Sequence, residues 1–128
     1  MVQRMVQVAA MIAASTLGLA RPPYIGVACR RVPNLTTCGR IGIGVWLKRP
    51  ARGVDAALSR AHVRLHAGGF GGTGPTYWEG YVRVRKRDLP RGWYGGDPPF
   101  FLRLRINLRY PTGTARGTVR VLLHPGWG

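Results

Sequence analysis

Apolar and polar residues alternate along most of the chain after residue 20, and this period of two predicts β-strands. The clearest run is 102–110, where Leu, Leu, Ile, Leu and Tyr alternate with Arg, Arg, Asn and Arg. The same pattern predicts strands over 41–47, 61–66, 78–84 and 119–123. No segment beyond residue 20 holds a 3.6-residue period, so we expect no long helix there.

Two weaker signals complete this set of strands. Residues 24–28 are apolar enough for a sixth strand, and a seventh is expected from the segments around Phe70 or Trp93. The run 54–58 has the composition of a single helical turn. Pro111-Thr112-Gly113-Thr114 is a turn signal between the last two long runs, which therefore predict a hairpin.

Short strands separated by turns rich in glycine and proline are typical of all-β folds. Residues 21–128 are therefore predicted to form one small antiparallel β-sandwich, with an immunoglobulin-like architecture as the commonest choice for this length. The likeness is architectural only. The cysteines lie close together in sequence, whereas an immunoglobulin bridge joins distant strands of two sheets.

The first twenty residues have the profile of a hydrophobic leader. One positive charge precedes an apolar run over 5–19, and Gly18 and Ala20 are small residues at the −3 and −1 positions of a cut before Arg21. Residues 1–20 are thus expected to be a signal peptide, which makes the protein secreted or part of the cell envelope.

Two alternatives to a cleaved leader remain open. Residues 5–19 could stay in place as a membrane anchor, although the run is shorter than the roughly 20 residues that span a bilayer. Val27-Ala28-Cys29 also ends like a lipoprotein site, but Gly26 stands where leucine is usual.

The two cysteines of the chain, Cys29 and Cys38, are nine positions apart across a Pro33-Asn34 turn. In an oxidising compartment they are expected to form a disulfide with each other. A redox role lacks the C-x-x-C motif, and zinc would need the fold to gather distant histidines.

Charge narrows the functional classes. The chain has 20 Lys and Arg against 4 Asp and Glu, a formal charge of +16, while 45% of its residues are apolar, which is enough for a core. Four carboxylates cannot supply both a calcium cage and a paired-carboxylate hydrolase site. They are Asp55, Glu79, Asp88 and Asp97.

The usual constellations of catalysis are absent from the sequence. Ser59 is the one serine after residue 20 and has no G-x-S-x-G turn around it. On a strand, His62 and His66 would lie about 13 Å apart on one face, too far to share a metal ion. The glycine-rich stretch 68–74 lacks the Gly-Lys-Ser/Thr of a phosphate loop. We therefore expect no catalytic residue, metal or cofactor; an enzyme built from Asp97, Glu79 and a histidine is the remote alternative.

Arginines on the polar phase of the predicted strands are the main candidate for function, because they point away from the core. Planar guanidinium groups suit phosphate, sulfate and carboxylate. The candidate anion-binding residues are Arg60, Arg64, Arg83, Arg85, Arg103, Arg105, Arg109 and Arg120. A GC-rich codon bias explains 18 arginines against two lysines, but it does not explain the scarcity of acidic residues.

The sequence leaves two readings of this charge. The arginines either coat a solvated surface with no specific ligand or bind an anionic polymer or membrane surface. Nucleic acid is not singled out as the ligand, since no RNP motif or basic helix is present. Four aromatic residues could stack on bases if they are not packed in the core. These are Trp78, Tyr81, Trp93 and Phe101. The expected function is non-enzymatic anion binding; a structural domain tethered to the envelope is the alternative.

Overall fold

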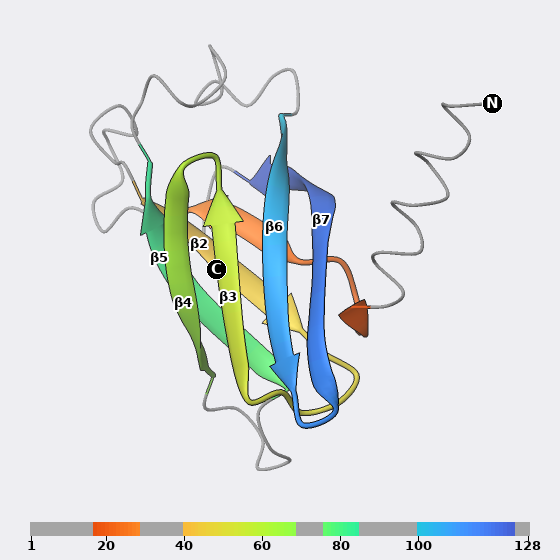
Figure 1. Ribbon diagram of the computed structural model, residues 1–128. Helices are drawn as coiled ribbons and strands as arrows, with labels where there is room; N and C mark the ends of the chain where they lie inside the picture. Colours follow the sequence, from red (N-terminus) through yellow and green to blue (C-terminus); the bar gives the residue numbers. More distant parts are fainter. Residues whose placement is uncertain (1–16, 29–39, 69–75, 85–99, 125–128) are drawn as a thin grey trace, which may run out of the picture.

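The computed structural model describes residues 17–28, 40–68, 76–84 and 100–124. They form seven strands, shown in Figure 1. The strands are β1 (Tyr24–Val27), β2 (Arg40–Trp46), β3 (Gly53–Leu58), β4 (Ala61–Ala67), β5 (Tyr77–Arg83), β6 (Phe101–Tyr110) and β7 (Gly113–His124). The expected all-β class is confirmed, and none of the described residues forms a helix long and apolar enough to cross a membrane.

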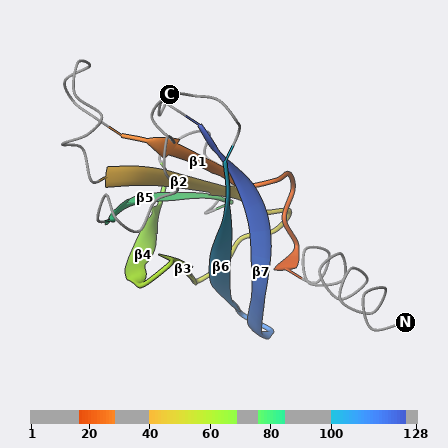
Figure 2. The ribbon, with the colours of Figure 1, turned by 90° about the horizontal axis from the view of Figure 1, so that it is seen from above.

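The strands close into one barrel in the order β1-β2-β5-β4-β3-β6-β7, so the expected β-sandwich is wrong. Two stacked sheets would leave four edges, but β4 pairs with both β3 and β5, and β1 pairs with both β2 and β7. Closure satisfies strand edges that a sandwich of this size would leave open. Figure 2 shows the strands surrounding a common interior.

The expected purely antiparallel arrangement is also wrong, because the barrel contains one parallel pair of strands. β1 runs parallel to β7, with Ile25 opposite Leu123 and Gly26 opposite His124, while the other pairs are antiparallel. A chain that contributes an odd number of strands to a closed up-and-down arrangement must bring two parallel strands together somewhere. Here that seam joins the first strand to the last.

The predictions for single segments of the chain have different outcomes. The hairpin expected at the end of the chain is confirmed, because every residue of β6 pairs with β7. The helical turn expected near residues 54–58 is wrong: this segment is β3, which lies between β4 and β6. Its Val54, Ala56 and Leu58 are buried on one side, as a strand requires. The segments around Phe70 and Trp93, where a seventh strand was expected, lie outside the described residues.

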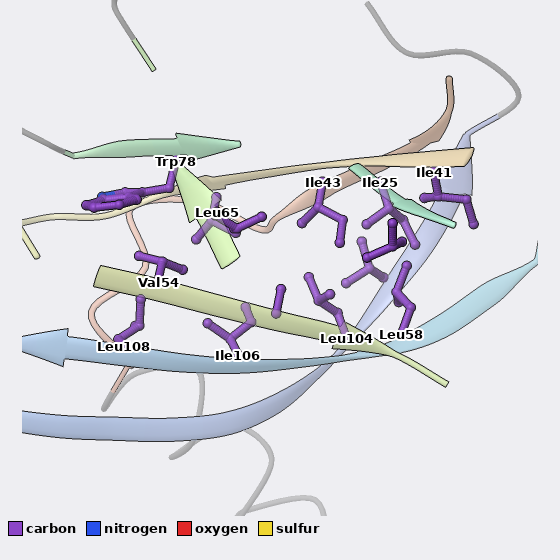
Figure 3. Packing of buried hydrophobic residues seen from close by; sticks show 14 of the residues in the cluster. Ile25, Ile41, Ile43, Val54, Leu58, Leu65, Trp78, Leu104, Ile106 and Leu108 are labelled. Atoms are coloured by element: carbon purple, nitrogen blue, oxygen red, sulfur yellow. The ribbon is translucent and has the colours of Figure 1, made fainter. Parts of the chain in front are cut away.

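The inward phase of every strand fills the barrel with aliphatic side chains, and Figure 3 shows part of this core. Ile25, Ile43, Val54, Leu104 and Leu108 are completely buried. No charged or polar residue among those described is buried. Burial of this continuous apolar interior is the main favourable term in folding, and it fixes which side of each strand faces the solvent.

The last residues of the predicted leader pack onto this barrel. Leu17 is 0% exposed, and its carbonyl accepts a hydrogen bond of 2.6 Å from the Tyr110 hydroxyl. Leu19 forms a bridge with Leu47. Gly18 adopts a φ of 73°, a left-handed conformation that glycine adopts without strain, and a side chain there would press on the Tyr110 hydroxyl. Residues 17–20 therefore close the barrel beside β2 and β6.

Candidate functional site

The outer surface of β4, β3, β6 and β7 carries most of the described arginines, and we call it the arginine face. These four strands lie side by side toward the viewer in Figure 1. Alternation along each strand sends every second side chain outward. The arginines of the face are Arg64 on β4, Arg103, Arg105 and Arg109 on β6, Arg116 and Arg120 on β7, and Arg60 in the turn between β3 and β4. All seven are exposed.

The fold gathers six of the eight arginines that the sequence singled out. Arg83 lies elsewhere, on β5, where it is paired with Arg40 of β2 on a different wall of the barrel. Arg85 lies outside the described residues. The sequence pattern correctly set the outward phase of these side chains, but strand order decided which of them share a wall.

Sequence reasoning missed Arg116. The predicted last strand began near residue 119, whereas β7 starts at Gly113 and pairs Arg116 with Asn107 of β6. The signal was present, because Arg116 is in the same phase as Thr118 and Arg120. The strand was not predicted this far back because Thr114 and Gly117 resemble turn residues.

Asp55 is the one carboxylate on β3, β4, β6 and β7. Its two oxygens lie 3.5 Å from Arg64 Nε and 3.8 Å from an Arg109 guanidinium nitrogen. The Arg109 side chain reaches it by lying across Gly53, where a Cβ atom would collide with the guanidinium. Asp55 therefore offsets part of the charge at one place on the face.

The other arginines of the face have no carboxylate partner among the described residues. Arg103 is directly opposite Arg120 in the β6–β7 pair. Arg105 donates a hydrogen bond of 2.5 Å to the Ser59 carbonyl, which orients its guanidinium without neutralising it. Like charges opposite each other on neighbouring strands are destabilising, so the face holds uncompensated positive potential.

An open groove of ≈ 810 Å³ crosses the middle of this face. Arg64, Arg105 and Arg116 lie along it, together with Asp55 and Asn107. The Oδ1 atom of Asn107 is buried without a hydrogen-bond partner in the described structure. The groove thus presents three guanidinium groups to the solvent and has the polarity to receive an anionic group.

The aromatic candidates are divided between core and surface. Trp78 is buried in the barrel, as its phase on β5 requires. Phe101 is 46% exposed, and the Arg120 guanidinium lies 4.4 Å from its ring centroid. Tyr81 is 40% exposed on the wall formed by β2 and β5, where Arg40 lies 4.8 Å from its ring. Trp93 lies outside the described residues.

A second polar cluster lies where β4 and β5 pair. Tyr77 donates a hydrogen bond of 2.9 Å to Glu79, and His66 Nε2 lies 3.9 Å from the other oxygen of that carboxylate. Burial, followed by the hydrogen bond to Glu79, raises the pKa of Tyr77 to about 12. Asp97, the third member of the remote enzyme hypothesis, lies outside the described residues. The raised pKa extends the range over which Tyr77 stays neutral further into alkaline pH.

The described residues give no support to the metal-binding and disulfide roles considered from the sequence. His62 and His66 are both exposed on β4, four residues apart. Within the described part of the chain, no group of three His, Cys, Asp or Glu side chains is placed to hold a metal ion. Cys29 and Cys38 lie outside the described residues, as does the loop 69–75, so the predicted disulfide stays a prediction.

Comparison with known proteins finds no matching family model, no matching curated protein and no matching solved structure. The function must therefore be derived from this chain's own geometry.

Proposed function

We propose that this protein is a non-enzymatic module that binds anionic polymers or surfaces through the arginine face. The observation that carries the proposal is the direct opposition of Arg103 and Arg120, beside Arg105 and Arg116, because none of the four forms an ion pair with a carboxylate of the described residues. A bound polyanion would screen this repulsion. Binding would then be strongest where the uncompensated charge is densest.

The groove supports the same proposal by offering geometry as well as charge. Arg105 is held by the Ser59 carbonyl, so its guanidinium loses less freedom when it meets an anion. Arg64 lies on the opposite side of the groove, partly offset by Asp55. An anionic group entering beside Arg105 on the side away from Asp55 would meet guanidinium groups from β6 and β7, an arrangement that one strand alone could not provide.

The test is salt-dependent retention of the full chain on a sulfated or phosphorylated resin. Changing Arg103 and Arg120 together to Gln should reduce retention and make it less dependent on salt. On duplex DNA, each phosphate contact contributes about 0.9 to the slope of log affinity against log salt concentration. Arg40 and Arg83 are the matched control, because they too form a directly opposed pair and one of them also stacks on an exposed aromatic ring.

Both double variants lower the net charge equally. A larger loss for the Arg103 and Arg120 variant supports a specific face. Equal losses would show that retention follows net charge alone and would overturn the proposal.

A second candidate function, a structural domain tethered to the envelope, is favoured by one observation. Leu17 is fully buried and its carbonyl is bonded to Tyr110, so a cut before Arg21 would remove part of the barrel's packing. A protein that is not cut at all keeps both these residues and the hydrophobic segment before them. Mass measurement of the natural product tests this, because a product that begins at Arg21 contradicts the tether.

A further inference from the structure

Phe101 and Tyr81 are the two large apolar side chains most exposed to solvent among the described residues. Each lies beside a pair of directly opposed arginines, and in each case one of those arginines covers part of the aromatic ring. The two clusters are Phe101 with Arg103 and Arg120, and Tyr81 with Arg83 and Arg40. They differ in the outward-facing residues that follow them along the barrel wall.

The wall below Phe101 stays basic and contains the groove. The outward residues that follow on β6 are Arg103 and Arg105, and β7 adds Arg116. On the side of Tyr81 away from Arg83, the next outward residue of β5 is instead Glu79, and the β2 residues opposite Tyr81 and Glu79 are glycines. Among the described residues, only the Phe101 cluster is therefore continuous with a broad positive surface.

We propose that the arginine face docks onto anionic lipid headgroups with Phe101 inserted at the membrane interface. This rests on the proposed function, which it narrows to one class of partner. A sulfated or phosphorylated polysaccharide would use the arginines alone, because such a hydrated chain offers the phenyl ring no apolar surface to bury against. A bilayer surface offers both charge and an apolar layer beneath it.

The position of Phe101 fits this role. It begins β6, at the upper end of the face in Figure 1, opposite the partly buried Leu122 of β7. Its ring is held against Arg120, which can contact headgroup phosphate while the ring lies deeper. The groove then lies beside the same membrane surface and can receive a headgroup between Arg105 and Arg116.

The experiment measures co-sedimentation of the full chain with vesicles, either pure phosphatidylcholine or equal parts phosphatidylcholine and phosphatidylglycerol. Phe101→Ser should lower binding to the anionic vesicles about fivefold, from the apolar area it no longer buries. Phe101→Trp should preserve or raise it, because tryptophan favours the membrane interface. Arg120→Gln should also lower it about fivefold, the loss expected for one basic residue.

Tyr81→Ser is the matched control and should change vesicle binding less than about twofold, because a docked arginine face points Tyr81 away from the bilayer. Retention on dextran sulfate separates the two proposals. Phe101→Ser should leave that retention unchanged. Loss of vesicle binding alone therefore supports membrane docking.

Three results would overturn the inference. They are equal losses for Phe101→Ser and Tyr81→Ser, unchanged vesicle binding by Phe101→Ser, and equal binding of the protein to both kinds of vesicle. If dextran sulfate retention survives such a result, the polyanion function stands without the membrane. If retention also fails to distinguish the arginine pairs, the proposed function itself is wrong.

Discussion

Arg103 on β6 lies directly opposite Arg120 on β7, so two guanidinium groups project from paired positions of the same hairpin. Arg120 turns onto the ring of Phe101. Three other arginines in the described structure also stack on aromatic rings: Arg21 on Trp46, Arg40 on Tyr81 and Arg49 on Tyr110. Such contacts occur about once per 70–80 residues in proteins. With few carboxylates available, aromatic faces take over part of their role as partners of arginine.

Relieving the opposition of Arg103 and Arg120 should stabilise the barrel. We expect Arg103→Thr to raise the free energy of unfolding by about 0.2–1 kcal/mol, the range for cross-strand pairs, as measured by urea denaturation. The gain should shrink in about 1 M salt, where the Debye length is about 3 Å. A gain that is the same at low and high salt would assign the effect to the strand propensity of threonine instead.

A carboxylate placed opposite Arg105 should neutralise part of the positive charge in the groove. Thr118 is exposed and pairs with Arg105 across β6 and β7, so Thr118→Glu should weaken retention on a polyanion resin at unchanged or slightly higher stability. Thr114→Glu is the control, since it adds the same charge opposite Arg109, which already contacts Asp55. Thr118→Glu should cause the larger loss; the reverse order would exclude the groove as the binding region.

Leu17 should contribute to stability in any form of the protein that retains it. Because this side chain is fully buried, Leu17→Ala should lower the free energy of unfolding by about 2–5 kcal/mol. Thr112→Ala, at an exposed position in the β6–β7 turn, is a control expected to change stability by less than about 0.5 kcal/mol. No effect of Leu17→Ala in a chain shown by mass to keep residue 17 would refute its place in the core.

Tyr77 should make stability depend on pH in the alkaline range. Its pKa is about 12 in the folded protein and 10.0 ordinarily, so between these values the unfolded chain releases a proton that the folded chain keeps. Stability is therefore fully supported by this group below pH 10.0 and is lost as the pH rises to about 12.

Thermal unfolding of wild type and Tyr77→Phe across this window provides the measurement. The difference between the two proteins should narrow as the pH rises, because only the wild type carries the titrating hydroxyl. The raised pKa of Tyr110, which has burial as its main cause, is common to both proteins and cancels. Parallel curves would show that burial and the Glu79 contact do not raise the pKa of Tyr77 in the folded protein.

The sequence alone determined most of the strands and which of their side chains face the core. Alternation over 102–110 fixed which residues of β6 enter the core and which arginines face the solvent, because side-chain direction reverses at every residue of a strand. It also predicted the β6–β7 hairpin from the turn signal over 111–114, although β7 begins at Gly113 and so earlier than the predicted last strand. The run 54–58 was misread because its alanines and Asp55 have weak strand propensity; pairing with β4 and β6 overrides it.

Only the tertiary structure decided how the strands close and which arginines meet. A period of two says nothing about neighbours, and both a sandwich and a barrel satisfy it. The choice depends on distant pairings, such as Ile25 with Leu123. Those pairings put Arg64 of β4 beside the groove with Arg105 and Arg116, and they send Arg83 to another wall. Outward direction is local information, whereas adjacency is created by contacts between residues far apart in the chain.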